Sequence, residues 1–290
     1  PKTTSYQRWA EALGAFSRSE SLLAQKSYWR KIESAAVKPL PTDSPTTGHR
    51  YDETEVSTLG VSLPDRHEHI ADSTVQAMLL AALADALKVW TGCECSRVLL
   101  SGHGRVPMDA GVDVSRTVGW FTANYPFLLS ASQASDHATR MAEIQAAFDR
   151  VPAVGLGYGV LRYLTPPELK ADVAFAPAPE ISLNYLGRVE AASDGIFSLS
   201  DRMPNASIGK LERAPRLEFE AMLRGPALVI SVRYCPRLDR RSRVERLGVA
   251  FGNRLKEAMQ DFLQPLQERR PGINSTEVEI SERLKERTVS

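Results

Sequence analysis

The 290-residue sequence contains little of what marks several specialised classes of protein. Its three cysteines are too few for a disulfide framework, and one residue separates Cys93 from Cys95 where zinc and redox pairs usually have two. Lys plus Arg (36) nearly equals Asp plus Glu (35), which argues against a strongly basic nucleic-acid binder. No apolar run approaches the roughly 20 residues that span a bilayer. We therefore expect a reduced, cytoplasmic protein that binds no metal and interacts with neither nucleic acid nor membrane.

What the sequence does have is the composition of a globular protein with interleaved helices and strands. Hydrophobic residues make up 43% of the chain and charged residues 24%, which suffices for one large core or two modest ones. Apolar periodicity predicts helices over residues 6–16, 21–32, 73–90, 137–148, 155–164 and 244–263. Strands are predicted over residues 54–63, 97–100, 121–129, 180–186, 216–223 and 227–234. The predicted fold class is therefore α/β, or α+β, with a mixed sheet.

Local signals refine the ends of these elements. Thr4 and Ser73 each stand three residues before a glutamine (Gln7 and Gln76), the capping-box spacing that begins a helix. Pro126 has no backbone N–H to give to a strand ladder. Its strand is therefore expected at a sheet edge or at a bulge.

Histidines are the first residues to inspect for chemistry, because they titrate near neutral pH and bind metals. His67 and His69 would share one face of a strand but have no obvious third ligand, so a solvated loop is the preferred interpretation. His49 and His137 are isolated in the sequence, and both are expected at the surface. The glycine-rich segment 155–159 follows a helix rather than a strand and lacks the P-loop lysine, so it is interpreted as a structural turn.

Residues 101–129 form the densest group of polar, aromatic and glycine residues in the chain. His103 lies between Gly102 and Gly104 at the end of a predicted strand, where the glycines permit a tight backbone path. The polar and aromatic residues that follow are Arg105, Arg116, Trp120, Asn124 and Tyr125. From the residues alone, the segment is either catalytic or a packed crossover with satisfied polar groups.

This segment resembles the condensation superfamily of nonribosomal peptide synthetases, and specifically its epimerization domain. The family motif Glu-Gly-His-Gly-Arg, followed by Asp-x-Ser-Arg-Thr-Val-Gly-Trp-Phe-Thr, is matched at residues 102–105 and 113–122. Residues 1–13 and 151–164 are also similar to family segments. Residues 180–189 contain the Asn-Tyr-Leu-Gly string that separates epimerization from condensation domains. The resemblance extends to about residue 265.

The resemblance implies a chloramphenicol-acetyltransferase-like fold of two lobes with a tunnel between them. The phosphopantetheine arm of a peptidyl carrier protein would enter the tunnel with an aminoacyl or peptidyl thioester, as a substrate tether and not as a bound cofactor. The reaction would invert the Cα centre from L to D by removing a proton on one face and returning one on the other. The implied partners are the carrier protein, the N-terminal lobe of the same domain and adjacent synthetase domains, with no metal.

Two departures from the family pattern bear on activity. The second family motif, His-His-x-x-x-Asp-Gly, belongs to the first lobe and is absent here, so residues 1–265 are expected to be a C-terminal lobe without its partner, inactive alone. Ser101 replaces the family's acid/base Glu, and a hydroxyl cannot hold a proton at neutral pH as a carboxylate can. Residues 266–290 are expected to be a linker or a docking tail.

The matched motifs supply the candidate site residues. Tyr185 is expected to orient substrate, to donate to an enolate oxygen, or instead to pack in the core, and Ser101 takes the place of the family carboxylate. His103 is expected to hold its turn, and Arg105 to form an ion pair with the segment around Asp113 and Arg116. The tunnel and motif residues are Gly102, His103, Gly104, Arg105, Arg116, Trp120, Asn124 and Asn184.

Two other functions remain open at this point. Loss of the motif carboxylate is compatible with a degenerate lobe that binds a carrier protein or a neighbouring domain without chemistry. An amide-forming condensation domain is the third alternative, which the Asn184-Tyr185-Leu186-Gly187 string disfavours. Whether the chain is itself an enzyme is therefore left open.

Overall fold

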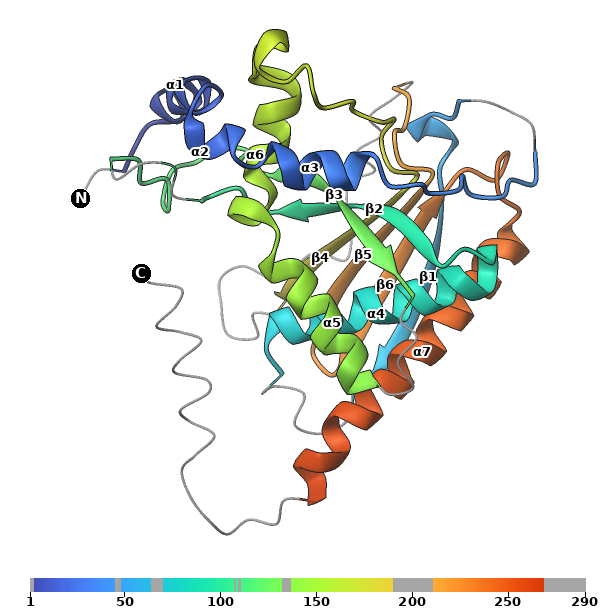
Figure 1. Cartoon of the computed structure of the whole chain (residues 1–290). Coiled ribbons are helices and arrows are strands. Elements are labelled where there is room, and N and C mark those ends of the chain that lie inside the picture. Colours follow the sequence, from blue (N-terminus) through green and yellow to red (C-terminus); the bar gives the residue numbers. More distant parts are fainter. Residues whose placement is uncertain are drawn as a thin grey trace.

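A computed structural model describes residues 3–44, 48–63, 70–106, 108, 111–131, 137–189 and 211–268. They build a six-stranded sheet in the order β1-β6-β5-β4-β2-β3 (Figure 1). The strands are β1 (Glu55–Ser62), β2 (Cys95–Gly102), β3 (Ala123–Ser130), β4 (Ile181–Val189), β5 (Leu217–Arg224) and β6 (Ala227–Tyr234). Strand β4 runs parallel to both β2 and β5, while the other three pairs are antiparallel. The predicted mixed sheet is confirmed.

The strands form where apolar residues alternate, because successive side chains of a strand point to opposite faces. Leu100, Leu183, Phe219 and Ile230 are at most 2% exposed and lie on one face of the sheet. β3 is an edge strand, and Pro126 lies in it opposite Leu99. The expected edge position of this proline is confirmed, since an edge strand tolerates a missing N–H.

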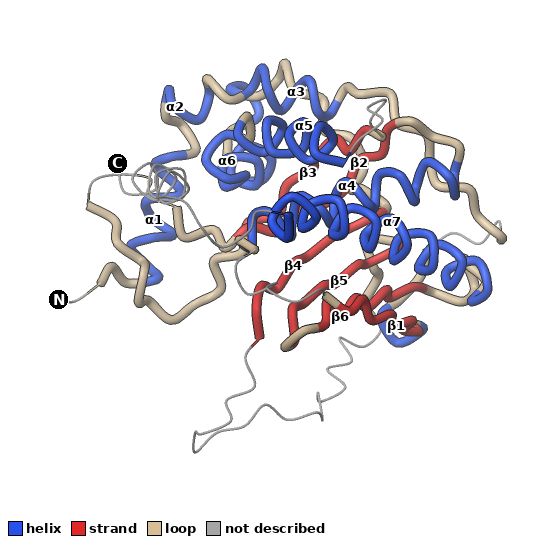
Figure 2. The backbone as a smooth tube through the Cα atoms, turned by 90° about the horizontal axis from the view of Figure 1, so that it is seen from below, coloured by secondary structure: helices blue, strands red, loops and turns tan. Residues whose placement is uncertain are grey.

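Three helices cover that buried face: α4 (Asp72–Thr91), α5 (His137–Asp149) and α7 (Arg241–Glu268) (Figure 2). The ring of Phe219 packs edge-on against Phe251 of α7, with 5.7 Å between ring centroids. α7 continues through Pro265 to Glu268, beyond its predicted end and into the first residues of the expected tail. The opposite face of the sheet, called the second face below, is not covered by these helices (Figure 2).

The remaining helices lie along the β3 side and the ends of the sheet. They are α1 (Tyr6–Phe16), α2 (Glu20–Leu23), α3 (Lys26–Glu33), α6 (Leu156–Gly159), the 3-10 turns η1 (Tyr51–Glu53), η3 (Pro152–Gly155) and η5 (Pro167–Leu169), and the π-helical η4 (Val160–Leu164). The single helix predicted over residues 21–32 is thus two helices, separated by a turn at residues 24–25. The predicted helix over residues 155–164 is divided between η3, α6 and η4.

Both predicted capping boxes are wrong, because Thr4 is engaged by a distant segment and α4 begins one residue before Ser73. The hydroxyl of Ser5 caps α1 by accepting from the N–H of Arg8 at 3.2 Å. Thr4 instead pairs with Asp113, donating its N–H to the Asp113 carbonyl at 2.7 Å. α4 begins at Asp72, so Ser73 lies inside its first turn. Asp72, at the start of α4, is acidic and interacts favourably with the helix dipole.

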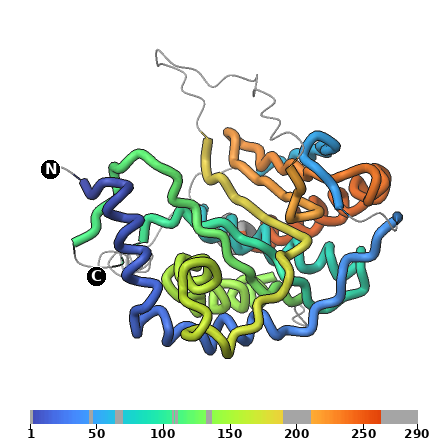
Figure 3. The backbone as a smooth tube through the Cα atoms, turned by 90° about the horizontal axis from the view of Figure 1, so that it is seen from above, coloured from blue at the N-terminus to red at the C-terminus, as the bar shows by residue number. Residues whose placement is uncertain are grey.

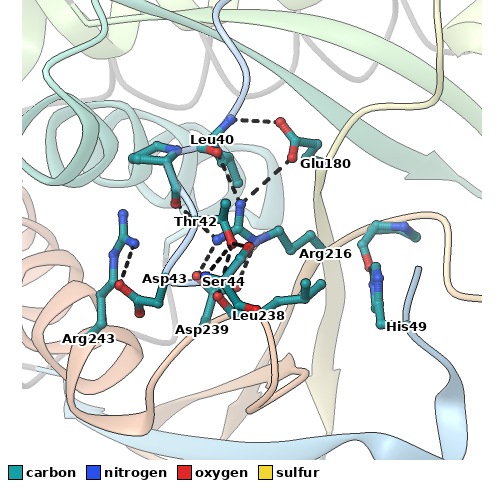
Figure 4. Close-up of polar contacts among 12 residues, drawn as sticks. Leu40, Thr42, Asp43, Ser44, His49, Glu180, Arg216, Leu238, Asp239 and Arg243 are labelled. Carbon is teal, nitrogen blue, oxygen red and sulfur yellow. Dashed lines mark hydrogen bonds and ion pairs between the residues drawn. The ribbon is translucent and has the colours of Figure 1, made fainter. Parts of the chain in front are cut away.

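A buried ion pair anchors the segment that crosses one end of the sheet (Figure 4). Arg216 is 6% exposed and Asp239 is 0% exposed, and the guanidinium binds both carboxylate oxygens at 2.7 and 2.5 Å. The same guanidinium donates to the carbonyls of Leu40 and Pro41 at 3.1 and 2.9 Å. One arginine thus connects residues 40–41, the start of β5 and the turn before α7.

The two isolated histidines are not both at the surface. His49 is 8% exposed, and its Nε2 lies 3.1 Å from the carbonyl oxygen of Pro215 (Figure 4), so the surface prediction for it is wrong. The next residue, Arg50, forms an antiparallel β-bridge with Glu212, and the His49 carbonyl accepts from the N–H of Arg213 at 2.9 Å, so His49 lies beside the segment that contains Pro215. His137 is partly buried, with its Nδ1 2.5 Å from the carboxylate of Asp261.

Candidate functional site

The turn after β2 requires glycine at two positions. Gly104 has a φ of 65°, and a Cβ at this position would overlap the carbonyl of Phe121. A Cβ on Gly102 would lie 3.1 Å from the carbonyl oxygen of Val154. The backbone therefore approaches closely at both glycines, and at Gly104 the positive φ adds a conformation that only glycine adopts cheaply.

Replacing Gly104 by alanine is expected to lower the free energy of unfolding by about 2–4 kcal/mol, because it combines a positive φ with a backbone clash. The measurement is urea unfolding followed by circular dichroism. Gly111→Ala is the matched control, since a Cβ on Gly111 would meet nothing within 4 Å and its φ is not positive. Equal stability of the two variants would contradict this account of the turn.

His103 is exposed, and its ring stabilises the turn itself. The backbone N–H of Arg105 donates to His103 Nδ1 at 3.0 Å. Nδ1 is therefore an acceptor, which leaves the proton of the neutral ring on Nε2. This placement agrees with the structural role expected for His103.

Residues 111–122 pack against α1, as Figure 3 shows for the segment that follows β2. The hydroxyl of Thr117 donates to the carbonyl of Thr4 at 2.6 Å, and the ring of Trp9 meets Phe121 edge-on at 4.7 Å. Arg116 and Trp120 are exposed on this segment, Trp120 to 78%. They belong to the surface of the loop and not to the second face of the sheet.

Arg105 does not form the expected ion pair with Asp113. Its guanidinium donates to the main-chain carbonyl of Val114 and lies 4.1 Å from the ring centroid of Phe121. The carboxylate of Asp113 accepts from the N–H of Ser115 at 2.9 Å, and this backbone hydrogen bond lowers the pKa of Asp113. Both residues therefore hold the loop, each through a local partner.

A row of polar side chains crosses the second face where β2 ends. Ser101 of β2 pairs with Asn124 of β3, and its hydroxyl donates to Asn124 Oδ1 at 2.8 Å. Leu100 pairs with Leu183, so the next residues along these two parallel strands, Ser101 and Asn184, are neighbours. Asn184 in turn pairs with Glu220 of β5. We call Asn124, Ser101, Asn184 and Glu220 the polar row.

Tyr185 lies on the other face of the sheet from Asn184, because adjacent residues of a strand alternate. Its hydroxyl donates to Asp72 Oδ1 at 2.8 Å, at the start of α4. Burial, and then the hydrogen bond to the Asp72 carboxylate, raise the pKa of Tyr185 well above its usual value. The structure therefore joins Tyr185 to a helix and does not bring it together with Ser101.

Glu220 is the member of the polar row that sequence reasoning missed. Every second residue of β5 is buried, which shows that Glu220 points away from the buried face; the buried residues are Leu217, Phe219, Ala221 and Leu223. That alternation does not show which strands lie beside β5. Only the sheet order places a carboxylate in the same row as Ser101.

Comparison with known proteins decides the family. The condensation-domain family matches residues 1–271, which is most of the chain. The chain belongs to the condensation-domain family. Surfactin synthase subunit 1 from Bacillus subtilis (strain 168) is 36% identical over 242 residues, which are 80% of this chain and 7% of that protein. Tyrocidine synthase 2 from Brevibacillus parabrevis is 34% identical over 246 residues, which are 80% of this chain and 7% of that protein.

Among solved structures, this condensation-family chain is similar to the epimerization domain from the third module of tyrocidine synthetase B. The TM-score is 0.80 at 30% identity, over 89% of this chain and 60% of that domain. A structure from the enacyloxin polyketide synthase, on condensation-domain-mediated chain release, shares the fold alone, with a TM-score of 0.55 at 16% identity over 95% of this chain and 53% of that one. The expected chloramphenicol-acetyltransferase-like fold is confirmed.

The described part of this condensation-family chain holds neither a cluster of metal ligands nor a membrane-spanning helix. Within it, no three His, Cys, Asp or Glu side chains come together as metal ligands would. His67 and His69 lie outside the described residues. None of the helices in that part of the chain is both long and apolar enough to cross a bilayer.

Proposed function

We propose that this chain is the C-terminal lobe of an epimerization domain of a nonribosomal peptide synthetase. Its substrate is an aminoacyl or peptidyl thioester on a carrier protein, whose Cα it inverts from L to D. The observation that carries the proposal is the 0.80 TM-score at 30% identity to a solved epimerization domain. The Asn-Tyr-Leu-Gly string in β4 adds to it.

The polar row fits the chemistry of such a site. Removing the Cα proton of a thioester places negative charge on the thioester oxygen, and hydrogen-bond donors aimed at that oxygen stabilise the enolate. The amide of Asn184 is such a donor on the second face, whereas the single O–H of Ser101 already donates to Asn124. Tyr185 is bound to Asp72 on the opposite face, so we assign it a positioning role between β4 and α4.

The proposal includes partners and a place in a larger assembly. The chain matches 60% of the solved epimerization domain, and it contains no His-His-x-x-x-Asp-Gly string. We therefore assign the histidines of that motif to an N-terminal lobe that completes the domain. The substrate is tethered to the phosphopantetheine arm of a cytoplasmic carrier protein. Adjacent synthetase domains are the remaining partners, and residues 266–290 are assigned as a linker or docking tail that follows residues 1–265.

The test follows deuterium uptake from solvent at Cα of an L-aminoacyl thioester loaded on the carrier. The module that contains this chain and the completing lobe is expected to exchange, and the isolated 290-residue chain is not. Ser101→Glu in the module is expected to raise the rate at least about tenfold, since a positioned acid or base contributes roughly 10²–10⁴-fold. Exchange by the isolated chain would contradict the proposal, and amide formation between two loaded carriers would indicate a condensation domain instead.

One observation favours a second candidate function, a degenerate lobe that binds without chemistry. The hydroxyl of Ser101 is engaged by Asn124 at 2.8 Å, in the place where the family has its acid/base carboxylate. This candidate predicts that the complete module binds the loaded carrier but shows no exchange, either as it is or after Ser101→Glu. The same deuterium experiment therefore separates the two functions.

A further inference from the structure

The polar row on the second face has no carboxylate at position 101, but it contains the carboxylate of Glu220. Glu220 follows Asn184 in the register across the sheet, and Ser101 precedes it. We propose that Glu220 is the catalytic carboxylate of this site, taking over from β5 the acid/base role that Ser101 cannot perform from β2. This inference rests on the proposed epimerization function and names a residue for it.

The register puts both positions within reach of the same space. Asn184 lies between Ser101 and Glu220, one strand from each, and neighbouring strands are about 4.8 Å apart. Long side chains on a sheet reach over their diagonal neighbours. A carboxylate at position 101 and one at position 220 can therefore approach a group above Asn184 from opposite sides.

The surroundings of Glu220 keep its carboxylate on this face. Arg233 of β6 donates to its two oxygens at 3.1 and 3.4 Å, and the Glu220 side chain is 20% exposed. This ion pair keeps the Glu220 carboxylate on the second face, beside β6. The other carboxylate on the second face of β5, Glu218, lies beside Ser182 and pairs with the buried Arg213 at 3.3 Å. Glu220 is thus the carboxylate that the described strands place in the row of Ser101.

The proposed step balances without an oxidant or a reductant. A Glu220 oxygen takes the Cα proton, and the electron pair of the broken C–H bond forms the enolate of the thioester. An imidazolium of the completing lobe then gives a proton to the opposite face of Cα, and the new C–H bond forms from the enolate electrons. Glu220 releases its proton to solvent and the imidazole regains one, so the net change is inversion of Cα.

The experiment uses the complete synthetase module, with its carrier loaded with an L-aminoacyl thioester, and measures deuterium uptake at Cα. Glu220→Gln is expected to lower the exchange rate about 100-fold or more, since it keeps the shape and removes the base. Glu218→Gln is the matched control and is expected to stay within about twofold of the wild type. The double variant Ser101→Glu/Glu220→Gln is expected to regain exchange, because the carboxylate returns to the family position.

Each outcome decides the inference. If Glu220→Gln exchanges within about twofold of the wild-type module, or if Glu218→Gln loses as much, Glu220 is a structural residue and the inference is wrong, while the proposed function stands. If neither the wild-type module nor Ser101→Glu exchanges, the proposed function fails together with the inference. Recovery in the double variant distinguishes a lost base from a misfolded protein, since a folding defect caused by Glu220→Gln would persist there.

Discussion

Asp239→Ala is expected to lower the free energy of unfolding by about 3–5 kcal/mol, the cost of leaving a buried charge without its partner. The carboxylate of Asp239 is 0% exposed and accepts from Arg216 at 2.7 and 2.5 Å. Without it, the guanidinium keeps its charge in the interior, with the carbonyls of Leu40 and Pro41 and, at 3.8 Å, the half-exposed carboxylate of Glu180 as its remaining partners. The measurement is urea unfolding of the 290-residue chain followed by circular dichroism.

The matched control removes an ion pair that solvent already screens. Arg254 and Glu257 pair at 2.9 Å with side chains 43% and 48% exposed. Exposed pairs of this kind contribute little to stability, so Glu257→Ala is expected to leave the denaturation midpoint unchanged. If Asp239→Ala behaves like this control, the pair in Figure 4 does not anchor residues 40–41.

Glu33→Ala is expected to have a similar cost, about 3–5 kcal/mol, because one buried carboxylate holds several donors. The Glu33 side chain is 2% exposed and stands at the end of α3. It accepts from the hydroxyl of Tyr158 at 2.5 Å, from Arg97 at 3.3 Å and from the N–H of Ala176 at 3.0 Å, and Arg162 lies 3.7 Å away. The residue therefore joins α3, β2, α6 and the segment before β4.

Glu33→Gln provides the comparison within the same site. Its amide oxygen still accepts a hydrogen bond, but the negative charge between the two arginines is lost, so its stability is expected to lie between those of the wild type and Glu33→Ala. Thermal unfolding of the three proteins at one pH gives the order. Equal stability of Glu33→Ala and the wild type would show that the donors find water or other partners.

Much of the secondary structure follows from local patterns. The alternation around Phe219 predicts β5, and the wide apolar stripe that contains Leu83 predicts α4. The failures are at element ends and in the interiors of two predicted helices, residues 21–32 and 155–164, which the structure divides. The local spacing predicts that the hydroxyl of Thr4 caps a helix, whereas it accepts from the N–H of Asp113 at 3.0 Å. That partner is far away in the chain, and no local rule includes it.

In the candidate site, too, some features can be predicted from the sequence and others cannot. The Gly-His-Gly turn can be predicted from the sequence, because two glycines so close together indicate a tight backbone path. The sequence does not predict which groups Gly102 and Gly104 approach, namely the carbonyls of Val154 and Phe121. The motif alone leaves Tyr185 either at the substrate or packed in the core. Its hydrogen bond to Asp72 places it against α4 instead.

By itself, the sequence determined the six strands, most of the helices, the glycine turn and the loss of a carboxylate at position 101, because these depend on residue type and on periodicity along the chain. Only the tertiary structure decided that β4 lies between β2 and β5, and hence that Glu220 shares a row with Ser101 while Tyr185 faces away. Strand order and register depend on contacts between segments distant in the chain. A pattern that repeats every two residues within one strand contains no information about its neighbours.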